Sequence, residues 1–151
     1  MVCPFCGNMK TSVRNSRHTS RRGQVWRRRQ CEKCGRLFTT RESVEVGFLE
    51  VIKRSNKREC FSRAKLLRSL ILATDHLSRD GAEAAYSLAD IIESNLLTKL
   101  RLKKTKDLTT KEIAKEISTV LKRFDLRSYI KYISYQTEHL DASDLKKTLK
   151  R

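Results

Sequence analysis

The apolar positions beyond residue 61 recur every three or four residues, which is the spacing of amphipathic helices. Ser62 can cap the first of these helices, and Asp80 followed by Glu83 resembles the capping box of a second. We expect both apolar stripes to pack in a core rather than to bind a ligand. Their members are Leu66, Leu67, Leu70 and Ile71 in the first helix, and Leu88, Ile91, Ile92 and Leu96 in the second.

Two further helices follow with the same periodicity. Thr109 and Glu112 form a better capping box for the third helix, and Asp125 can start a final one. The expected core positions are Ile113, Ile117, Val120 and Leu121 in the third helix, and Leu126, Ile130 and Ile133 in the fourth. Four helices of this size are enough for a small α-rich domain.

The segment just before the helices has the pattern of a β-hairpin. Residues 48–54 indicate a strand, residues 55–57 a turn, and residues 58–61 a short returning strand. Lysine and arginine side chains of this hairpin and of the first helix can converge on a phosphate chain. These are Lys53, Arg54, Arg58 and Lys65, and on spacing alone an ordinary basic edge strand, protected from pairing, is the better interpretation.

The first third of the chain is polar and extended. Residues 11–17 and 24–30 indicate two strands around a polar loop, and Leu37 with Phe38 is expected to close a very small core. Because successive side chains of a strand point to opposite faces, neighbouring arginines of residues 27–29 cannot all meet one groove of a nucleic acid. Some would bind phosphates, and one or two would reach base edges.

Four of the five cysteines form two matched pairs at the ends of this segment. Cys3 and Cys6, like Cys31 and Cys34, are separated by two residues, and a glycine follows each pair. Four thiolates match the closed tetrahedral shell of a structural zinc ion. A redox dithiol or an iron–sulfur cluster is the alternative, but a redox C-x-x-C belongs to an α/β unit that this segment cannot form. We expect one structural Zn²⁺ per chain, and Cys60 to be a half-buried free thiol.

The predicted fold class is therefore α+β: a four-cysteine zinc ribbon followed by a β-hairpin and about four helices. The chain has a formal net charge of +17, which favours a polyanionic partner. Residues 1–46 hold 11 Lys and Arg against 3 Asp and Glu, whereas residues 47–151 hold 23 against 14. This first third is the denser basic region, and it favours nucleic-acid contact over a solvated charged surface.

Several function classes are disfavoured. The only glycine after Gly47 is Gly81. The two glycine-rich phosphate-binding patterns, G-x-x-x-x-G-K and G-x-G-x-x-G, are therefore both impossible in the second part of the chain. No Ser/His/Asp set is recognisable, and His18, His76 and His139 are scattered, so we expect no enzyme. No apolar run is long enough to span a bilayer, and the N-terminus lacks the pattern of a secretion signal. We therefore expect a cytoplasmic protein in which the thiols stay reduced and no membrane is a partner.

The order of these motifs resembles the NrdR family of bacterial repressors of ribonucleotide reductase genes. The resemblance extends over about residues 1–135. It is carried by Cys3-Pro-Phe-Cys6, Asn15-Ser-Arg17, Arg27-Arg-Arg-Gln-Cys31, Cys34-Gly-Arg-Leu-Phe-Thr-Thr40, Val51-Ile-Lys-Arg54, Arg58-Glu-Cys-Phe61, Lys65-Leu66 and Tyr129-Ile-Lys-Tyr132.

The resemblance implies an ATP-cone after the ribbon, with domains at residues 1–46 and 47–140 and a basic tail at 141–151. It implies ATP or dATP as the effector, a homo-oligomer that changes with the bound nucleotide, and double-stranded operator DNA as the partner at the nucleoid. The implied nucleotide contacts are Val51, Lys53, Arg54, Glu59, Lys65 and Tyr132. Tyr129 is the alternative to Tyr132, and both tyrosines could equally be core residues. The expected DNA contacts are Arg14, Arg17, Arg27, Arg28 and Arg29.

This chain departs from the usual family pattern at several positions. Asn15 stands where the family usually has Asp, Arg41 where it has an aromatic residue, and Cys60 where it has Pro. The runner-up hypothesis is a zinc-ribbon protein that binds RNA or the ribosome. A third is a regulatory fragment of a nucleotide-processing enzyme, because ATP-cones also occur on reductase subunits.

Overall fold

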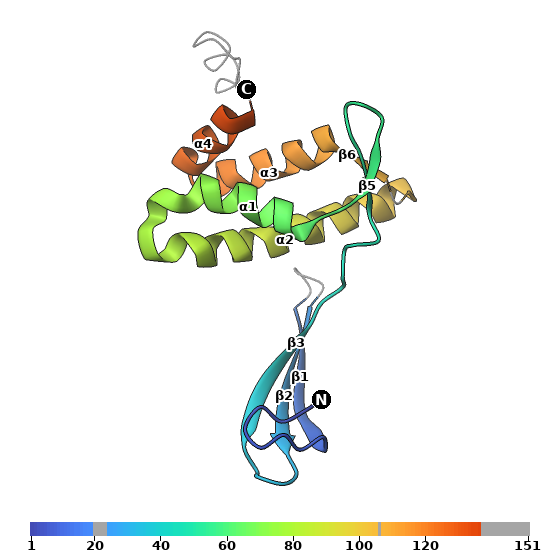
Figure 1. Cartoon of the computed structure of the whole chain (residues 1–151), viewed down its shortest axis with the longest axis vertical. Coiled ribbons are helices and arrows are strands. Elements are labelled where there is room, and N and C mark those ends of the chain that lie inside the picture. Colours follow the sequence, from blue (N-terminus) through green and yellow to red (C-terminus); the bar gives the residue numbers. More distant parts are fainter. Residues whose placement is uncertain (20–23, 106, 137–151) are drawn as a thin grey trace. The chain divides into compact units, whose positions relative to one another are not determined.

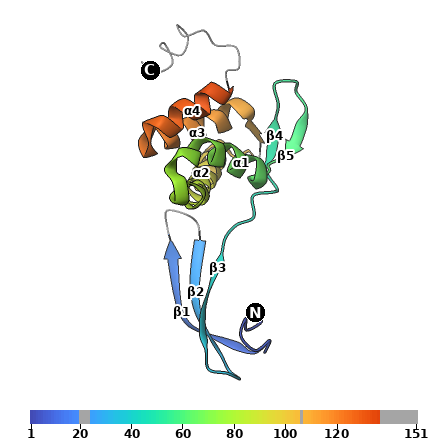
Figure 2. The ribbon, with the colours of Figure 1, turned by 60° about the vertical axis from the view of Figure 1, so that its left-hand side comes forward.

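The computed structural model describes residues 1–19, 24–105 and 107–136, and the predicted basic tail at 141–151 lies outside them. The chain divides into two compact units, Met1–Glu45 and Val46–Arg151. Figures 1 and 2 show an all-β first unit, and a second unit in which helices pack beside a small sheet. None of the helices in the described residues has the length and apolar character needed to cross a membrane.

The first unit is a three-stranded antiparallel sheet in the order β1-β2-β3 (Thr11–Thr19, Gln24–Cys31 and Leu37–Glu42). The first two strands match the prediction. Val13 pairs with Arg29 and Asn15 with Arg28, so a β-bulge leaves Arg14 between two paired positions. The sheet is small, and few of its apolar side chains are buried.

The prediction that Leu37 helps to close this core is wrong. Leu37 is 46% exposed, whereas Phe38 is half-buried. The reason is the alternation of side chains along β3, which places Leu37 on the more exposed face of the sheet and Phe38 on the other. The ribbon therefore has even less of an apolar core than its sequence suggests.

The second unit contains a mixed three-stranded sheet in the order β5-β4-β6 (Arg58–Cys60, Glu50–Ile52 and Asp107–Thr109). β4 and β5 form the predicted hairpin, and β6 pairs in parallel with β4. The sequence pattern did not reveal β6. The predicted strand at 48–54 is shorter than expected, because Phe48 lies in a turn and is 57% exposed.

Four α-helices and one 3₁₀-helix complete the unit. They are α1 (Arg63–Thr74), η1 (Asp75–Asp80), α2 (Gly81–Lys103), α3 (Thr110–Phe124) and α4 (Leu126–Gln136). α1 packs against α2 and α4, and α3 also packs against both. Their shared core contains the buried Leu70, Ala89, Ile92, Leu96, Leu108 and Leu121, among others.

Three of the four predicted helix starts are confirmed. The Ser62 side chain accepts a hydrogen bond from the Lys65 backbone N–H, and Thr109 with Glu112 forms a complete capping box. The Asp125 carboxylate accepts the Ser128 backbone N–H at 2.7 Å, at the start of α4. These local patterns involve residues three positions apart, which is why the sequence shows them clearly.

The fourth start and some expected core positions need correction. Asp80 has helical dihedral angles and makes no side-chain cap, because η1 runs directly into α2. Ile71, Leu126 and Ile130 are exposed, at 40%, 59% and 37%. In α4 the buried face instead contains Tyr129, Tyr132 and Ile133, so the aromatic residues set the packing side of this helix.

The turn between α1 and α2 depends on a close backbone approach. A Cβ at Gly81 would lie 2.5 Å from the Thr74 carbonyl oxygen, so only glycine fits without a shift. The Thr74 hydroxyl, which is buried, lies 2.9 Å from the Gly81 carbonyl oxygen.

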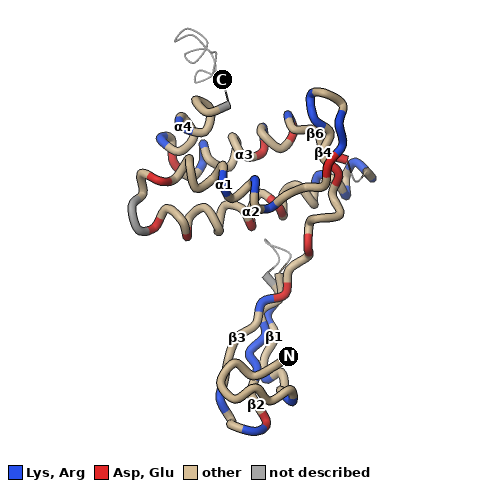
Figure 3. Tube along the Cα trace, in the orientation of Figure 1, with Lys and Arg blue, Asp and Glu red and all other residues tan. Residues whose placement is uncertain are grey.

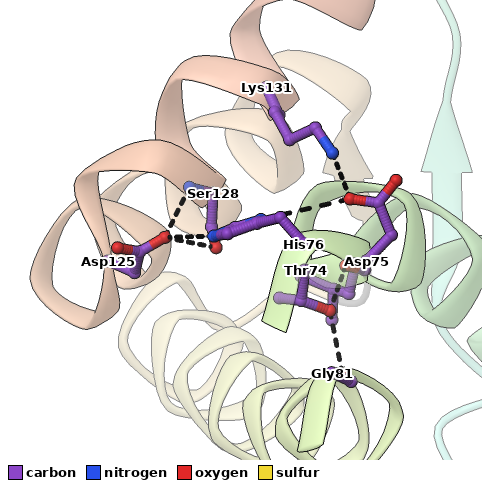
Figure 4. A network of polar contacts seen from close by, with 8 residues as sticks. Thr74, Asp75, His76, Gly81, Asp125, Ser128 and Lys131 are labelled. Atoms are coloured by element: carbon purple, nitrogen blue, oxygen red, sulfur yellow. Dashed lines mark hydrogen bonds and ion pairs between the residues drawn. The ribbon is translucent and has the colours of Figure 1, made fainter. Parts of the chain in front are cut away.

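A polar network fixes α4 to the same corner of the unit (Figure 4). His76 Nε2 lies 3.0 Å from Asp125 Oδ2, and the Ser128 hydroxyl donates to the same oxygen at 2.8 Å. Lys131 forms an ion pair with Asp75 on η1. His76 is therefore part of the packing between η1 and α4.

Candidate functional site

The first candidate site is the cluster of four cysteines at one end of the ribbon. The sulfur atoms of Cys3, Cys6, Cys31 and Cys34 all lie within 4.8 Å of one another. The Cys3–Cys34 sulfur distance is 3.7 Å, and the Cys6–Cys31 distance is 3.6 Å. A zinc ion with sulfur ligands at about 2.3 Å in a tetrahedron separates those sulfurs by about 3.8 Å. The cluster therefore fits zinc.

The backbone builds the two cysteine pairs in the same way. The Gly7 N–H donates to the Cys3 carbonyl at 3.0 Å, and the Gly35 N–H donates to the Cys31 carbonyl at 3.0 Å. Both glycines have positive φ, at 69° and 68°. No atom lies within 4 Å of a Cβ built at either position, so the left-handed backbone conformation and not space explains the choice of glycine.

The thiols of this cluster differ in their affinity for protons. Backbone N–H groups of Cys34 and Lys33 stabilise the Cys31 thiolate and lower its pKa to about 6. The Asn8 backbone N–H acts in the same direction on Cys6, but desolvation and the neighbouring thiols raise its pKa to about 11. A bound metal ion would supply the positive charge that keeps all four sulfurs deprotonated.

The predicted arginines lie on two different faces of the sheet. Arg28 pairs with Asn15 and Thr39, and Arg17 pairs with Trp26, so Arg17 and Arg28 share one face. Arg27 and Arg29 lie on the other face, as the alternation predicted, and Arg14 is in the bulge. Figure 3 shows how basic residues follow the strands of this unit.

The second candidate site is a cavity of about 210 Å³ in the second unit. Four of the predicted nucleotide contacts, Val51, Glu59, Lys65 and Tyr132, line it together. The sequence did not predict the other lining residues as ligand contacts: Cys60, Phe61, Ser62, Leu66, Ser69, Thr110, Ile113, Ala114 and Ile117. Thr110 comes directly after the predicted helix cap Thr109. This position at the start of a helix is the only feature of the sequence that could have indicated it.

The predicted basic residues reach this cavity unequally. The Glu59 carboxylate binds Lys53 at 2.7 Å and Lys65 at 2.9 Å, which joins the hairpin to α1. Hydrogen bonds from Lys53 and Lys65 lower the pKa of Glu59 to about 2, so this carboxylate is ionised near neutral pH. Arg54 lies in the exposed hairpin turn and is not among the lining residues.

Two other side chains at the cavity differ in exposure. Tyr132 is only 3% exposed, and burial raises its pKa well above the usual range, so its phenol stays neutral. Cys60 is exposed, and the prediction of a half-buried thiol is wrong. Side chains alternate along β5, so Cys60 and Arg58 lie on the exposed side of the strand while Glu59 lies on the half-buried side.

Both parts of the chain match known domain families. A family described as "Transcriptional repressor NrdR-like, N-terminal domain" matches residues 1–42, and the ATP cone domain matches residues 49–141. These matches and the cysteine cluster confirm the predicted fold class, a mixed α+β chain with a four-cysteine zinc ribbon followed by an ATP-cone.

Curated relatives match almost the whole chain. The transcriptional repressor NrdR of Chlamydia felis is 34% identical over 149 residues, which cover 99% of this chain and 94% of the relative. The protein of the same name from Hyphomonas neptunium is 36% identical over 144 residues, covering 95% and 87%. These relatives are named as repressors and not as enzymes. The resemblance inferred from the motifs is thereby confirmed, and the chain belongs to the NrdR family of transcriptional repressors.

Proposed function

We propose that this chain is a repressor of ribonucleotide reductase genes that binds operator DNA through its zinc ribbon and responds to ATP or dATP bound in its ATP-cone. The observation that carries the proposal is the pairing of two sites in one chain. A basic sheet ends in a four-sulfur cluster, and a separate domain has a cavity lined by Lys65 and Glu59, with Lys53 paired to the same Glu59 carboxylate.

The ribbon supports the DNA-binding half of the proposal. Its described strands carry exposed arginines, and the duplex is a dense array of phosphate charges that arginine side chains neutralise. Zn²⁺ on Cys3, Cys6, Cys31 and Cys34 would hold the strands in register without taking part in a reaction. Of the expected contacts Arg14, Arg17, Arg27, Arg28 and Arg29, we propose Arg14, Arg17 and Arg28, because Arg27 is paired with Glu42 and Arg29 is half-buried against Thr40.

The cavity supports the nucleotide-binding half. Val51, Ile117 and Tyr132 offer apolar and aromatic surface for a base and sugar, and Lys65 lies at the rim. Ligand sites for small molecules usually have about 300 Å³ or more, and this cavity has about 210 Å³. We infer that a triphosphate would extend beyond the cavity toward Lys53 and Arg54 of the hairpin.

The ion pairs of Glu59 with Lys53 and Lys65 reduce the positive charge that this site offers to a phosphate. The Glu59 carboxylate neutralises the two lysines that would bind phosphates, so a nucleotide must compete with an internal anion. Once released, Glu59 can accept hydrogen bonds from a sugar hydroxyl, and Tyr132 can close the apolar side of the site. Each of these residues binds or orients the ligand, and none has a role in bond cleavage.

Regulation then follows from linkage. A nucleotide shifts the assembly of the chain only by binding one oligomeric form more tightly than another. We propose that dATP favours the form in which paired ribbons meet a repeated operator in the bacterial cytoplasm. Ample deoxynucleotide would thus stop further synthesis of the reductase.

The test combines three measurements on the zinc-loaded full chain. ATP or dATP is titrated while the assembly size is followed by light scattering and the affinity for a reductase-promoter duplex by anisotropy. We expect the two nucleotides to give different assemblies and DNA affinities. Unchanged size and affinity would contradict the sensor, and a preference for structured RNA over the duplex would favour an RNA-binding protein instead.

A further inference from the structure

The two faces of the ribbon sheet differ in chemistry, although both carry arginines. We define the Trp26 face by six of the side chains that the register places on one side of the sheet, and the Arg27 face by six of those on the other side. The Trp26 face holds Asn15, Arg17, Trp26, Arg28, Thr39 and Arg41. The Arg27 face holds Ser16, Arg27, Arg29, Phe38, Thr40 and Glu42.

The two arginines of the Arg27 face already bind other side chains of the same sheet. The Arg27 guanidinium donates to the two oxygens of Glu42 at 2.8 and 3.1 Å and to Ser16 at 3.1 Å. Arg29 Nε donates to the Thr40 hydroxyl at 3.1 Å, and Arg29 is half-buried. A phosphate on this face would have to displace the Glu42 carboxylate from a two-bond pair and would also meet its negative charge.

The Trp26 face is more exposed and carries one sign of charge. It has three exposed arginines and no acidic residue among the positions that define it. Arg28 Nη1 donates to the Thr39 hydroxyl at 3.1 Å, which a ligand can replace without meeting a carboxylate. Arg41 stacks its guanidinium 4.4 Å from the ring centre of Trp26, which is itself 41% exposed. Asn15, Arg17, Trp26, Arg28 and Thr39 line a hollow of about 260 Å³ on this face.

We propose that the Trp26 face is the surface that reads duplex DNA, an assignment that rests on the proposed DNA-binding function. Asn15, Arg28 and Thr39 form one row across the three strands, with Arg17, Trp26 and Arg41 in the neighbouring row. Arginine recognises guanine and asparagine recognises adenine through paired hydrogen bonds in the major groove. Arg28 and Asn15 therefore meet base edges, while Arg17 and Arg41 bind phosphates beside them.

The first test compares neighbouring arginines of one strand in the zinc-loaded full chain. The probes are a duplex selected by this protein from a random-sequence library and a scrambled duplex of the same composition. Arg28→Gln is expected to reduce the preference for the selected duplex about tenfold or more. Arg17→Gln and Arg41→Gln are each expected to weaken binding to both duplexes. Each should also lower the slope of log affinity against log salt concentration by about one.

Arg27→Gln and Arg29→Gln are the matched controls, because they remove the same charge from the opposite face. We expect each to change the preference less than threefold, roughly the scatter of a surface substitution. Bound zinc and circular dichroism check that all five variants fold. The assignment would be overturned if Arg27→Gln and Arg29→Gln reduced the preference for the selected duplex as much as Arg28→Gln. It would also be overturned if Arg28→Gln left this preference unchanged.

A second measurement needs no substitution. Trp26 is the only tryptophan of the chain, so its fluorescence reports on this face alone. We expect its emission to change during a duplex titration with the same midpoint as the anisotropy signal. Binding without any change at Trp26 would place the DNA elsewhere and overturn only this inference. A chain that binds no duplex in any nucleotide state would instead remove the proposed function.

Discussion

The two units of this chain are both small, but different interactions stabilise them. In the ribbon, the buried apolar side chains among the described residues are Cys3 and Cys31, which both belong to the metal cluster. In the second unit, leucine, isoleucine and tyrosine side chains from every α-helix meet in one core. Metal binding therefore replaces a hydrophobic core where the sequence is too polar to build one. We expect loss of zinc to unfold the first unit and a cavity in the core to destabilise the second.

Removal of zinc should give the largest effect and should affect one unit only. Structural zinc contributes an apparent 10–16 kcal/mol or so in small finger domains, far more than a polar sheet of this size can supply. We expect a chelator to abolish amide protection in β1–β3 while protection in α1–α4 persists. Hydrogen exchange measured residue by residue checks this. A ribbon that keeps its protection without zinc would remove the contrast between the units.

The converse change is a cavity in the helical core. Leu96 is fully buried, and Leu96→Ala should cost about 2–5 kcal/mol of the unfolding free energy of the second unit. Zinc affinity should stay the same, because the substitution lies outside the ribbon. Denaturant unfolding and competition with a zinc indicator measure the two quantities. A weakened zinc site in this variant would show that the units are not independent.

Two glycine substitutions sharpen the comparison. Gly81→Ala puts a methyl group against the Thr74 carbonyl and should destabilise the second unit by about 1–3 kcal/mol. Gly35→Ala has room for the methyl group but needs a left-handed backbone, and it should cost about 1 kcal/mol or a little more, in the ribbon only. Thermal unfolding with separate probes for each unit tests the order of these effects.

The smallest expected effect concerns the charge bridge of the cavity. Glu59→Gln frees Lys53 and Lys65, so affinity for inorganic tripolyphosphate should rise about two- to fivefold, as expected for exposed ion pairs. Because the pKa of Glu59 is lowered to about 2, the bridge is present above about pH 4.5, the usual range of a glutamate, and is lost as the pH falls toward 2. Affinity should therefore show no change from this group between pH 6 and 8.

Glu50→Gln is the control for this last experiment. It removes the same charge from the adjacent strand, where Glu50 binds Arg58 at 2.9 Å and does not line the cavity. Isothermal titration with tripolyphosphate compares the two variants. Equal affinities would mean that Glu59 does not compete with phosphates.

What the sequence predicted well depends on residues close together along the chain. The two cysteine pairs and the Thr109 capping box are set within a few residues, so their spacing alone determines the geometry. β6 was missed because its three residues become a strand only by pairing with β4, more than 50 residues earlier. The Glu59 bridge was missed for a similar reason, since it needs the hairpin to fold back against α1.

The carboxylate of Asp125 has a mechanical consequence for the second unit. One of its oxygens accepts from the Ser128 backbone, the Ser128 hydroxyl and His76, and these contacts lower the pKa of Asp125. Helix α4 thus cannot rotate about its axis or slide along it without breaking a bond to η1. Because α4 also carries Tyr132, which lines the cavity, a ligand that displaced this helix would have to break the Asp125–His76 contact.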